Sequence, residues 1–515
     1  MPSALRSPTP VLSSPKAWPL YGVASSRDIE ARALADVPPY TLMARAGRSL
    51  ARLAQAVAPH APQVWIAAGP GHNGGDGLEA AACLREAGRI VQVHLWADPQ
   101  RLPTDAAHAL ERARRAGVPI VAGPDIDAPA ERPAGSLAID ALLGLGGRRA
   151  PQGPIAAAVQ ALRRHPGPVL AVDLPTGLDA DTGRSLGSGP DDVVRADHTL
   201  SLLTLKPGLF TADGRDLAGR VWFDDLGVHP QRPADAWLGA GQVPRPHRRH
   251  AHHKGSFGEV LVVGGAAGMG GALWLAARAA LAAGAGRVYA HPLDPQAPLL
   301  DPQQPELMGR DAATAASLPI DSLTVVCGCG GGSAIGSALP WWLGRAPRLV
   351  LDADALNAVA ADAGLQAQLQ RRARRGQSTV LTPHPLEAAR LLGATSSREV
   401  QADRLAAAQT LARHLDCTVV LKGSGTVIAQ ACGTPWINRT GNAALATAGT
   451  GDVLAGWLAG LWAQGLDAWT AATAAVFLHG AAADRWIAEG HGAPLRASVL
   501  IERLAASWSA STPTI

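Results

Sequence analysis

The sequence predicts an α/β protein with two domains, each a three-layer arrangement of helices on both faces of a sheet. The chain has 515 residues, which is more than one hydrophobic core normally supports, so we expect two domains. Short runs rich in Val, Ile and Leu alternate with Ala-, Leu- and Arg-rich segments of helical period, and this alternation is typical of doubly wound folds. The sequence contains no short-period repeat, and its two halves do not resemble copies of each other.

The expected strands follow one another in the same manner in both halves. In the first half they span 63–69, 90–96, 137–144, 169–175 and 198–205. In the second half they span 258–265, 287–293, 323–328, 348–354, 379–385 and 418–423. Residues 229–253 carry Pro, Gly and charge without either period, which predicts a linker. We therefore expect domains at 1–240 and 241–515, and no fixed structure for the Pro- and Ser-rich residues 1–24.

The composition fits a compact soluble protein with many turns. Hydrophobic residues make up 47% and charged residues 17% of the chain, and the formal net charge is +4. No dense Lys/Arg run is interleaved with aromatic residues, which argues against a nucleic-acid surface, while an anionic small substrate remains open. No apolar run reaches the roughly 18 residues of a membrane span, and no signal peptide is recognisable. Five scattered cysteines favour reduced thiols and a cytoplasmic protein.

Two clusters of potential metal ligands have simpler explanations. His247, His250, His252 and His253 lie in the linker without a Cys or carboxylate at ligand spacing, so a solvated run is favoured over a metal site. Cys327 and Cys329 are flanked by glycines, which favours a tight turn after a strand over a reactive thiol pair.

A stretch of the second half, "ATAGTGDVLAGWLAGL" (446–461), places two glycines and an acid at the start of a helix. The first amides of a helix are unpaired and carry partial positive charge, so Gly449 and Gly451 would let a phosphate approach bare backbone. Asp452 would repel that phosphate unless it acts as a base or positions a metal. The alternative is that Asp452 only caps the helix.

In the first half, the strand at 63–69 runs into a glycine-rich segment that we expect to be a loop wrapping a diphosphate. Asp140 and Asp173 each follow an apolar strand, so both should emerge at the same sheet edge as this loop. For each aspartate the alternative is a buried residue that caps the following turn.

Several motifs resemble known families when they are taken together. "GNAALATAGTGDVLAG" (441–456) resembles the anion hole and catalytic aspartate of ribokinase-like kinases, and "VVLKGSGTVI" (419–428) resembles their nucleotide loop. With "TPHPLEAARL" (382–391), "LDADALN" (351–357) and "HHKGSFGEVLVVGG" (252–265), the second half resembles the ADP- or ATP-dependent dehydratases of hydrated NADH and NADPH.

The first half independently resembles NAD(P)HX epimerase domains, where NADHX and NADPHX denote the hydrated cofactors. The motifs are "AAGPGHNGGDGLEAA" (67–81), "AIDALLGLG" (138–146), "VDLPTGLDADTG" (172–183) and "ADHTLSLLTLKPGL" (196–209). This order, epimerase and then dehydratase, resembles the bifunctional bacterial repair family over nearly the whole chain after about residue 25.

The resemblance implies a Rossmann-like epimerase domain with a potassium ion. Asp173 would be its acid/base group, and Arg148 or Arg149 would pair with a phosphate. The implied potassium ligands are Asn73, Asp140 and Thr176. The implied substrate contacts are His72, Asn73, Gly74, Gly75, Asp76, Asp173 and the closing loop of Gly144, Leu145, Gly146, Gly147, Arg148, Arg149 and Ala150.

The resemblance also implies a ribokinase-like dehydratase domain that converts ADP to AMP and phosphate, with Mg²⁺ to neutralise charge. Asp452 would be its base, and His384 would touch the substrate or, alternatively, be a buried structural histidine. The implied substrate contacts are Ala272, Gly330, His384 and Asp452. The implied nucleotide contacts are Lys422, Gly423, Ser424, Gly425 and Thr426, with Gly449, Thr450 and Gly451 for the transferred phosphate.

The chain departs from the family pattern at several positions. His72 stands in place of the usual Asn, Leu145 of Thr, Thr176 of Ser, Cys329 of Pro and Leu386 of Gly. Two other functions stay open from the sequence, a kinase of a small vitamin or sugar alcohol and a non-catalytic dinucleotide sensor. The sequence also leaves a homo-oligomer open.

Overall fold

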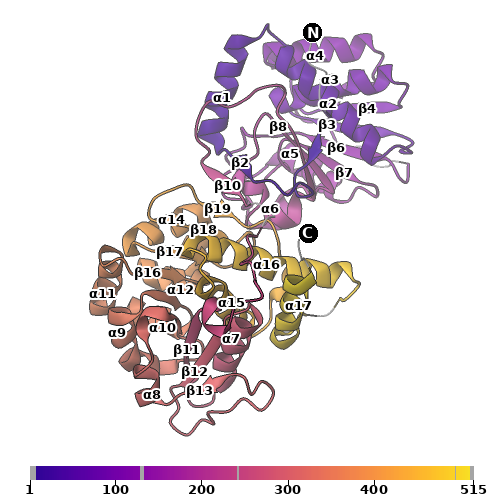
Figure 1. Cartoon of the computed structure of the whole chain (residues 1–515). Helices are drawn as coiled ribbons and strands as arrows, with labels where there is room; N and C mark the ends of the chain where they lie inside the picture. Colours follow the sequence, from indigo (N-terminus) through magenta and orange to yellow (C-terminus); the bar gives the residue numbers. More distant parts are fainter. Residues whose placement is uncertain (1–6, 128–132, 240–242, 493, 511–515) are drawn as a thin grey trace. The chain divides into compact units, whose positions relative to one another are not determined.

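The computed structural model describes residues 7–127, 133–239, 243–492 and 494–510, and these form two compact units (Figure 1). The units are Met1–Leu238 and Gly239–Ile515. The division falls inside the segment that we expected to be a linker.

The first unit contains an eight-stranded sheet in the order β1-β9-β8-β7-β6-β3-β4-β5. Its strands from β9 to β5 are parallel, and β1 pairs antiparallel with β9 at the edge. The chain builds outward from β3 to β5 and then returns to β6 on the other side of β3, so β3 and β6 flank a topological switch point. The strands are β1 (Thr9–Pro10), β3 (Val64–Ala68), β4 (Val91–Leu95), β5 (Ile120–Ala122), β6 (Leu137–Ala141), β7 (Val169–Val172), β8 (His198–Leu202) and β9 (Arg220–Asp224).

Helices cover both faces of this sheet, and the central strands β3 and β6 are therefore buried at every residue. Helices α2, α3 and α4 share one hydrophobic core with the strands, and α5 packs into a second core on the other face with Trp65 and Trp96. The helices are α1 (Val23–Asp36), α2 (Thr41–Val57), α3 (His72–Glu86), α4 (Thr104–Arg115), α5 (Gly153–Arg163) and α6 (Gly214–Leu217).

Two segments that we expected to be irregular each contain a strand. Within residues 1–24, strand β2 (Trp18–Leu20) pairs antiparallel with β10 (Ala236–Leu238), which lies inside the predicted linker. Trp18 and Leu20 are 6% and 0% exposed, so one face of this strand is buried. The strand is hard to recognise in the sequence because Pro and Ser residues surround it. Residues 1–6 of the predicted irregular segment lie outside the described residues.

The second unit has a sheet in the order β13-β12-β11-β14-β15-β16-β17-β18-β19. Pairing is parallel from β13 to β17 and antiparallel from β17 to β19. The chain again reverses its direction of growth between two neighbours, here β11 and β14. The strands are β11 (Glu259–Gly264), β12 (Arg287–Pro292), β13 (Met308–Gly309), β14 (Leu323–Cys327), β15 (Arg348–Leu351), β16 (Ser378–Leu381), β17 (Thr418–Leu421), β18 (Val427–Ala429) and β19 (Trp436–Ile437).

Two large cores sandwich this sheet. Helices α7, α15, α16 and α17 contribute to the core on one face, and α9 to α14 contribute to the core on the other. The helices are α7 (Gly270–Ala282), α8 (Ala312–Ala316), α9 (Ile335–Arg345), α10 (Asp354–Ala361), α11 (Ala363–Arg374), α12 (Pro385–Leu392), α13 (Ser397–Ala402), α14 (Arg404–Leu415), α15 (Thr450–Ala463), α16 (Ala468–Ala488) and α17 (Ala497–Ala510).

The predicted fold class, two α/β domains with helices on both faces of each sheet, is confirmed. Every strand expected from the sequence is present, although most end one to three residues early because the chain turns at the sheet edge. Among the described residues, no helix is long and apolar enough to cross a membrane.

Candidate active sites

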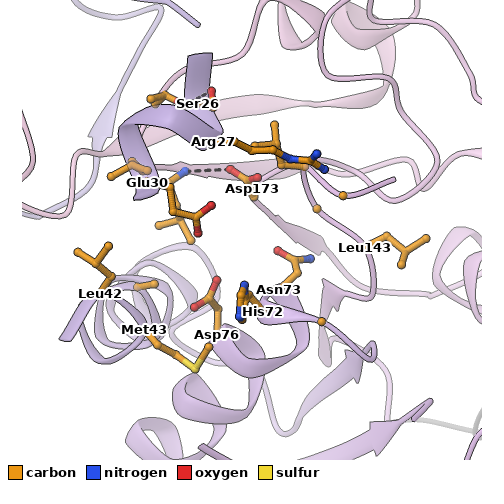
Figure 2. Close-up of a pocket in the computed structure, with 18 of the residues that line it drawn as sticks. Ser26, Arg27, Glu30, Leu42, Met43, His72, Asn73, Asp76, Leu143 and Asp173 are labelled. Atoms are coloured by element: carbon orange, nitrogen blue, oxygen red, sulfur yellow. Dashed lines mark hydrogen bonds between the residues drawn. The ribbon is translucent and has the colours of Figure 1, made fainter. Parts of the chain in front are cut away.

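A cavity of about 480 Å³ opens at the switch point of the first unit. The segments after β3, β6 and β7 border it together with helices α1 and α2 (Figure 2). Its lining includes the predicted substrate residues His72, Asn73, Asp76 and Asp173. This is the position at which doubly wound sheets bind ligands, at the carboxyl ends of the strands.

The glycine-rich segment after β3 is not the loop that we expected. Helix α3 begins at His72, so Gly74, Gly75 and Gly77 lie within it and are buried. A Cβ on Gly74 would meet the Gly69 carbonyl oxygen at 2.0 Å, and one on Gly77 would meet the Ala141 Cβ at 2.6 Å. These glycines therefore let α3 pack closely on the strand ends, and only Gly71 offers open backbone to a ligand.

Asp173 follows β7 in a left-handed conformation, with φ of 66°. This strained geometry is uncommon for a residue with a side chain and often marks a functional position. Its Oδ1 accepts hydrogen bonds from the Lys206 ammonium group and, at 3.3 Å, from the Leu202 amide. Its Oδ2 points toward Gly144, where a Cβ would lie 3.4 Å away. One carboxylate oxygen is thus held by the protein, and the other faces the cavity.

Lys206 was not among the site residues predicted from the sequence, although it lies in the motif at 196–209. Its side chain is 2% exposed and donates to the carbonyl oxygens of Leu202 at 2.8 Å and Thr204 at 2.9 Å. The available signal was a lysine among apolar residues directly after a buried strand, since such a residue needs an anionic partner.

Asp76 is a second carboxyl group in the cavity. Burial raises its pKa well above the usual range, and the neighbouring carboxylates of Asp173 and Glu30 raise it further. Asp76 therefore holds a proton to higher pH than an ordinary aspartate, beside an Asp173 that is paired with a lysine.

Asp140 and Thr176, two of the predicted potassium ligands, lie behind the cavity wall. Asp140 is fully buried, and its oxygens accept from the Thr176 amide at 2.8 Å and the Thr176 hydroxyl at 2.7 Å. The same hydroxyl accepts from the Leu143 amide at 3.0 Å. Burial raises the pKa of Asp140 to about 6. Asn73, the third predicted ligand, lines the cavity, and its buried Nδ2 has no hydrogen-bond partner among the residues that the structure describes.

The loop predicted to close over the substrate is only partly at the cavity. Gly144, Leu145, Gly146 and Gly147 line it, whereas Arg148, Arg149 and Ala150 are not among the described residues of its lining. The prediction that Arg148 or Arg149 pairs with a phosphate therefore has no support in this geometry.

In the second unit, Asp452 lies in the first turn of α15. The helix begins at Thr450, after Gly449 with φ of 88°, as the sequence predicts. The N-cap residue is Gly449, so Asp452 stands inside the first turn and not at the N-cap position. Burial raises its pKa to about 6, the nearby Asp352 raises it as well, and the Cys329 thiol lowers it by hydrogen bonding.

Three acidic or thiol side chains gather in front of this helix. Atoms of Cys329, Asp352 and Asp452 lie within 4.8 Å of one another. Lys422 pairs with Asp352 at 2.7 Å, and its ammonium nitrogen would lie 3.4 Å from a Cβ on Gly451. The lysine thus neutralises Asp352 and adds positive charge at the start of α15. Asp352, which directly follows β15, was not among the site residues predicted from the sequence.

The predicted nucleotide loop, Lys422–Thr426, joins β17 to β18. Gly423 has φ of 139°, and a Cβ there would lie 2.8 Å from a guanidinium nitrogen of Arg404. Arg404 is 1% exposed and donates to the carbonyl oxygens of Leu421 and Lys422, both at 3.2 Å. A buried cation therefore lies directly beneath the loop.

His384 caps helix α12. Its Nδ1 accepts from the amides of Leu386 at 3.1 Å and Glu387 at 3.3 Å, while Glu387 accepts from the His384 amide at 2.8 Å. Partial burial lowers the pKa of His384, as do Lys422 and other cations. The imidazole is 47% exposed, so the alternative of a buried structural histidine was wrong.

Gly330 and Ala272 meet where β11 and β14 end. A Cβ on Gly330, which has φ of 59°, would lie 3.0 Å from the Ala272 Cβ. Cys327 and Cys329 flank the turn before Gly330 and are fully buried, which agrees with the predicted tight turn. The linker histidines His252 and His253 accept hydrogen bonds from backbone amides of their own segment.

Comparison with known proteins agrees with this division. A family model described as NAD(P)H-hydrate dehydratase matches residues 260–505, and one described as YjeF-related protein N-terminus matches residues 39–208. A bifunctional NAD(P)H-hydrate repair enzyme of Escherichia coli (strain K12) is 37% identical over 469 residues, covering 86% of this chain and 85% of the relative. The chain belongs to the bifunctional NAD(P)H-hydrate repair family.

Other members of this repair family match over even more of the chain. The bifunctional NAD(P)H-hydrate repair enzyme of Coxiella burnetii (strain RSA 493 / Nine Mile phase I) is 35% identical and covers 94% of this chain and 98% of the relative. Among solved structures, the ADP/ATP-dependent NAD(P)H-hydrate dehydratase of Bacillus subtilis, co-crystallised with ATP/Mg²⁺, is 32% identical. It covers 52% of this chain and 94% of that chain, with a TM-score of 0.45.

As in a repair enzyme with two activities, the predicted residues gather in two separate groups, one in each unit. Seven predicted residues of the first unit are not among the described lining of its cavity. Gly74 and Gly75 serve helix packing and Asp140 and Thr176 lie behind the wall, and the other three are Arg148, Arg149 and Ala150. In the second unit, Lys422 and Gly451 lie beside the cluster of Cys329, Asp352 and Asp452. Ala272 lies against Gly330, which directly follows Cys329 in the chain.

Proposed function

We propose that this chain repairs hydrated NADH and NADPH. The first unit interconverts the (R) and (S) epimers, and the second dehydrates the (S) epimer while ADP is converted to AMP and phosphate. The observation that carries the proposal is the partly buried carboxylate of Asp452 at the N-terminus of α15, near the Lys422–Asp352 pair. Membership of the repair family supports the same conclusion.

Dehydration must expel a hydroxyl group, which is a poor leaving group. Asp452 takes the proton of that hydroxyl as its oxygen attacks the terminal phosphorus of ADP, and the bond to the AMP oxygen breaks. The lone pair of the ring nitrogen then expels the new phosphate ester as phosphate. Loss of a proton from the adjacent ring carbon restores the double bond of NADH.

The environment of Asp452 suits this role. Its pKa of about 6 means that the group is ionised at neutral pH yet basic enough to accept a proton. The unpaired amides at the start of α15 and the Lys422 ammonium group stabilise negative charge on the transferred phosphoryl group. Lys422 to Thr426 hold the nucleotide.

Epimerisation requires a proton relay at the hydroxylated ring carbon. We assign this role to Asp173, whose Oδ2 faces the cavity while Lys206 fixes Oδ1. The carboxylate takes the hydroxyl proton as the carbon–nitrogen bond opens to a carbonyl, and the nitrogen receives a proton. Closure on the opposite face of the carbonyl reverses these transfers and inverts the carbon.

The residues behind the first cavity fit a potassium ion. The buried Asp140 carboxylate accepts only from neutral donors among the described residues, so its charge lacks a cationic partner. Carboxylate, hydroxyl and amide oxygens from Asp140, Thr176 and Asn73 are suitable ligands for a hard cation. The ion would offset that charge and stabilise the wall formed by Leu142 and Leu143.

The side chains of the second site do not form a complete set of Mg²⁺ ligands by themselves. Cys329 supplies a thiol, and Asp352 is already neutralised by Lys422. Mg²⁺ prefers oxygen ligands and commonly binds through substrate phosphates, so the nucleotide itself would carry most of its coordination. The ion would supply neutralisation of the phosphate charge.

Product analysis tests the proposal against the kinase alternative. Incubation with (S)-NADHX and ADP should yield NADH, AMP and phosphate in equal amounts. Accumulation of a stable phosphorylated product would indicate a kinase, and binding without consumption of ADP would indicate a sensor. Replacement of K⁺ by a large organic cation should slow epimerisation and leave dehydration of the (S) epimer unchanged.

The free cysteines fit a cytoplasmic setting, which stays a prediction.

A further inference from the structure

The cavity of the first unit contains a cation that no family motif covers. Arg27 lies on α1, ahead of residues 39–208 that the family model matches. Its exposed side chain lines the cavity and has no hydrogen bond or ion pair within the described chain. In Figure 2 it extends past Asp173, on the opposite side of the cavity from His72 and Asn73 of α3.

The charges around this cavity are otherwise unfavourable for an anionic dinucleotide. Its lining includes the carboxyl groups of Glu30, Asp76, Asp105 and Asp173. Of the two permanent cations in the lining, Lys206 is committed to Asp173. Among the described residues of the lining, Arg27 is therefore the one permanent cation that is not paired with a carboxylate, and a phosphate in this cavity is most stable beside it.

A second positive feature borders the same space. Gly71 and His72 line the cavity at the N-terminus of α3, and a Cβ on Gly71 would meet nothing within 4 Å. The first amides of α3 are therefore open to an anion on one side of the cavity, while Arg27 faces it from α1. In Figure 2 Asp173 lies between these features, and the proposed epimerase reaction places the reacting ring beside it.

We propose that Arg27 binds a phosphate group of the hydrated dinucleotide and is a specificity residue of the epimerase site. This inference rests on the proposed epimerase function. It replaces Arg148 and Arg149, which do not line the cavity, as the phosphate ligand. A phosphate in this substrate comes from the diphosphate shared by NADHX and NADPHX or from the 2′-phosphate of NADPHX alone.

The test measures interconversion of the two epimers by chromatography with the full chain. ADP is omitted so that dehydration does not consume the substrate. Arg27→Ala should raise the KM for the dinucleotide roughly tenfold or more, because a charge-assisted hydrogen bond is lost, while kcat changes much less. Arg27→Lys should recover part of this loss because it retains the charge.

Arg32→Ala is the matched control. Arg32 lies on the same helix, pairs with Asp28 at 3.2 Å and is not among the residues of the cavity lining. This variant should keep the parental KM for both substrates. Because both arginines are exposed, the two variants should also keep the parental melting temperature.

The two substrates distinguish the sources of the phosphate. An equal rise in KM for NADHX and NADPHX would assign Arg27 to the diphosphate, and a rise for NADPHX alone would assign it to the 2′-phosphate. Parental KM values for both substrates in Arg27→Ala would overturn the inference while the epimerase function stands. A parent chain that does not interconvert the epimers would overturn the epimerase function and this inference with it.

Discussion

The Lys206 ammonium group is buried and directs all of its contacts to oxygen atoms, the first of which is Oδ1 of Asp173. Carbonyl oxygens of Leu202 and Thr204 occupy its other donor positions. A buried lysine of this kind is stable only with such partners. The arrangement leaves Oδ2 of Asp173 as the oxygen that can exchange a proton with a substrate.

Lys206→Met should destabilise the first unit and abolish epimerisation. Removal of one partner leaves a largely buried carboxylate without compensation, which costs about 3–5 kcal/mol. Calorimetry of thermal unfolding should show the loss. Arg114→Met is the control, because Arg114 and Glu111 form a pair with side chains 48% and 61% exposed, and such pairs contribute about 0–1 kcal/mol. Equal effects of the two substitutions would contradict a structural role for the Lys206–Asp173 pair.

Asp173→Asn and Asp452→Asn should have reciprocal effects. The first variant should still dehydrate the (S) epimer and leave the (R) epimer unused beyond slow spontaneous exchange. The second should interconvert the epimers and form no NADH, because the hydroxyl proton has no acceptor. Chromatography of both epimers, with and without ADP, measures the two activities. Loss of both activities in either single variant would show that the sites are not independent.

The dehydratase should lose activity in mildly acidic solution. Burial and the neighbouring Asp352 raise the pKa of Asp452 to about 6, so the group is protonated below that pH and cannot accept a proton. The kcat/KM for dehydration should therefore fall by about tenfold per pH unit below about 6. An acid limb centred near the usual aspartate pKa of about 4 would exclude Asp452 as the titrating base.

Cys329 offers a control for this assignment. Its thiol hydrogen bond lowers the pKa of Asp452, in opposition to burial and Asp352, which both raise it. Cys329→Ala should shift the acid limb of the profile to higher pH, whereas Cys329→Ser should keep it near the parental position. The same profile in all three proteins would show that the thiol does not act on the base.

Arg404→Met should weaken nucleotide binding more than it slows the chemical step. The guanidinium group of Arg404 donates hydrogen bonds to the carbonyl oxygens of Leu421 and Lys422 and places a positive charge next to Gly423. We expect the KM for ADP to rise roughly tenfold and kcat at saturating ADP to change little. Initial rates of NADH formation at varied ADP measure both quantities.

Arg372→Met is the matched control for Arg404. Arg372 is also 1% exposed, and it donates to the carbonyl oxygens of Leu343 at 2.6 Å and Ala346 at 2.8 Å. Burial lowers the pKa of both arginines to about 10. Arg372→Met should lower the melting temperature yet leave the KM for ADP unchanged. If the KM for ADP were the same in Arg404→Met and Arg372→Met, Arg404 would only stabilise the fold and would not contribute to nucleotide binding.

The strands and the two switch-point sites could be predicted because they depend on local signals. Runs of buried β-branched residues identify parallel strands, and an acid directly after such a run, as at Asp140 and Asp173, must emerge at the sheet edge. The start of α15 was equally readable, because Gly449 and Asp452 stand immediately before a helical apolar pattern.

The remaining features depend on contacts between distant segments. The role of Lys206 depends on its ion pair with Asp173, and the role of Arg404 depends on its contact with the turn at Gly423. The glycines of α3 were assigned to a ligand because a sequence does not distinguish backbone that faces solvent from backbone that packs on a strand. Arg148 and Arg149 were expected at the phosphate from their charge, but the direction of a loop is set by packing elsewhere.

The most direct test of the account follows the near-ultraviolet absorbance of NADH after pure (R)-NADHX is added to the chain with ADP, Mg²⁺ and K⁺. Because only the (S) epimer is dehydrated, the (R) epimer yields NADH faster than spontaneous epimerisation allows only if both units act in sequence. We predict complete conversion at a rate well above spontaneous epimerisation. Asp173→Asn should lower the rate to that of spontaneous epimerisation, and Asp452→Asn should abolish NADH formation. Absorbance that stays flat with the parent chain, or that rises equally in both variants, would contradict the proposed repair function.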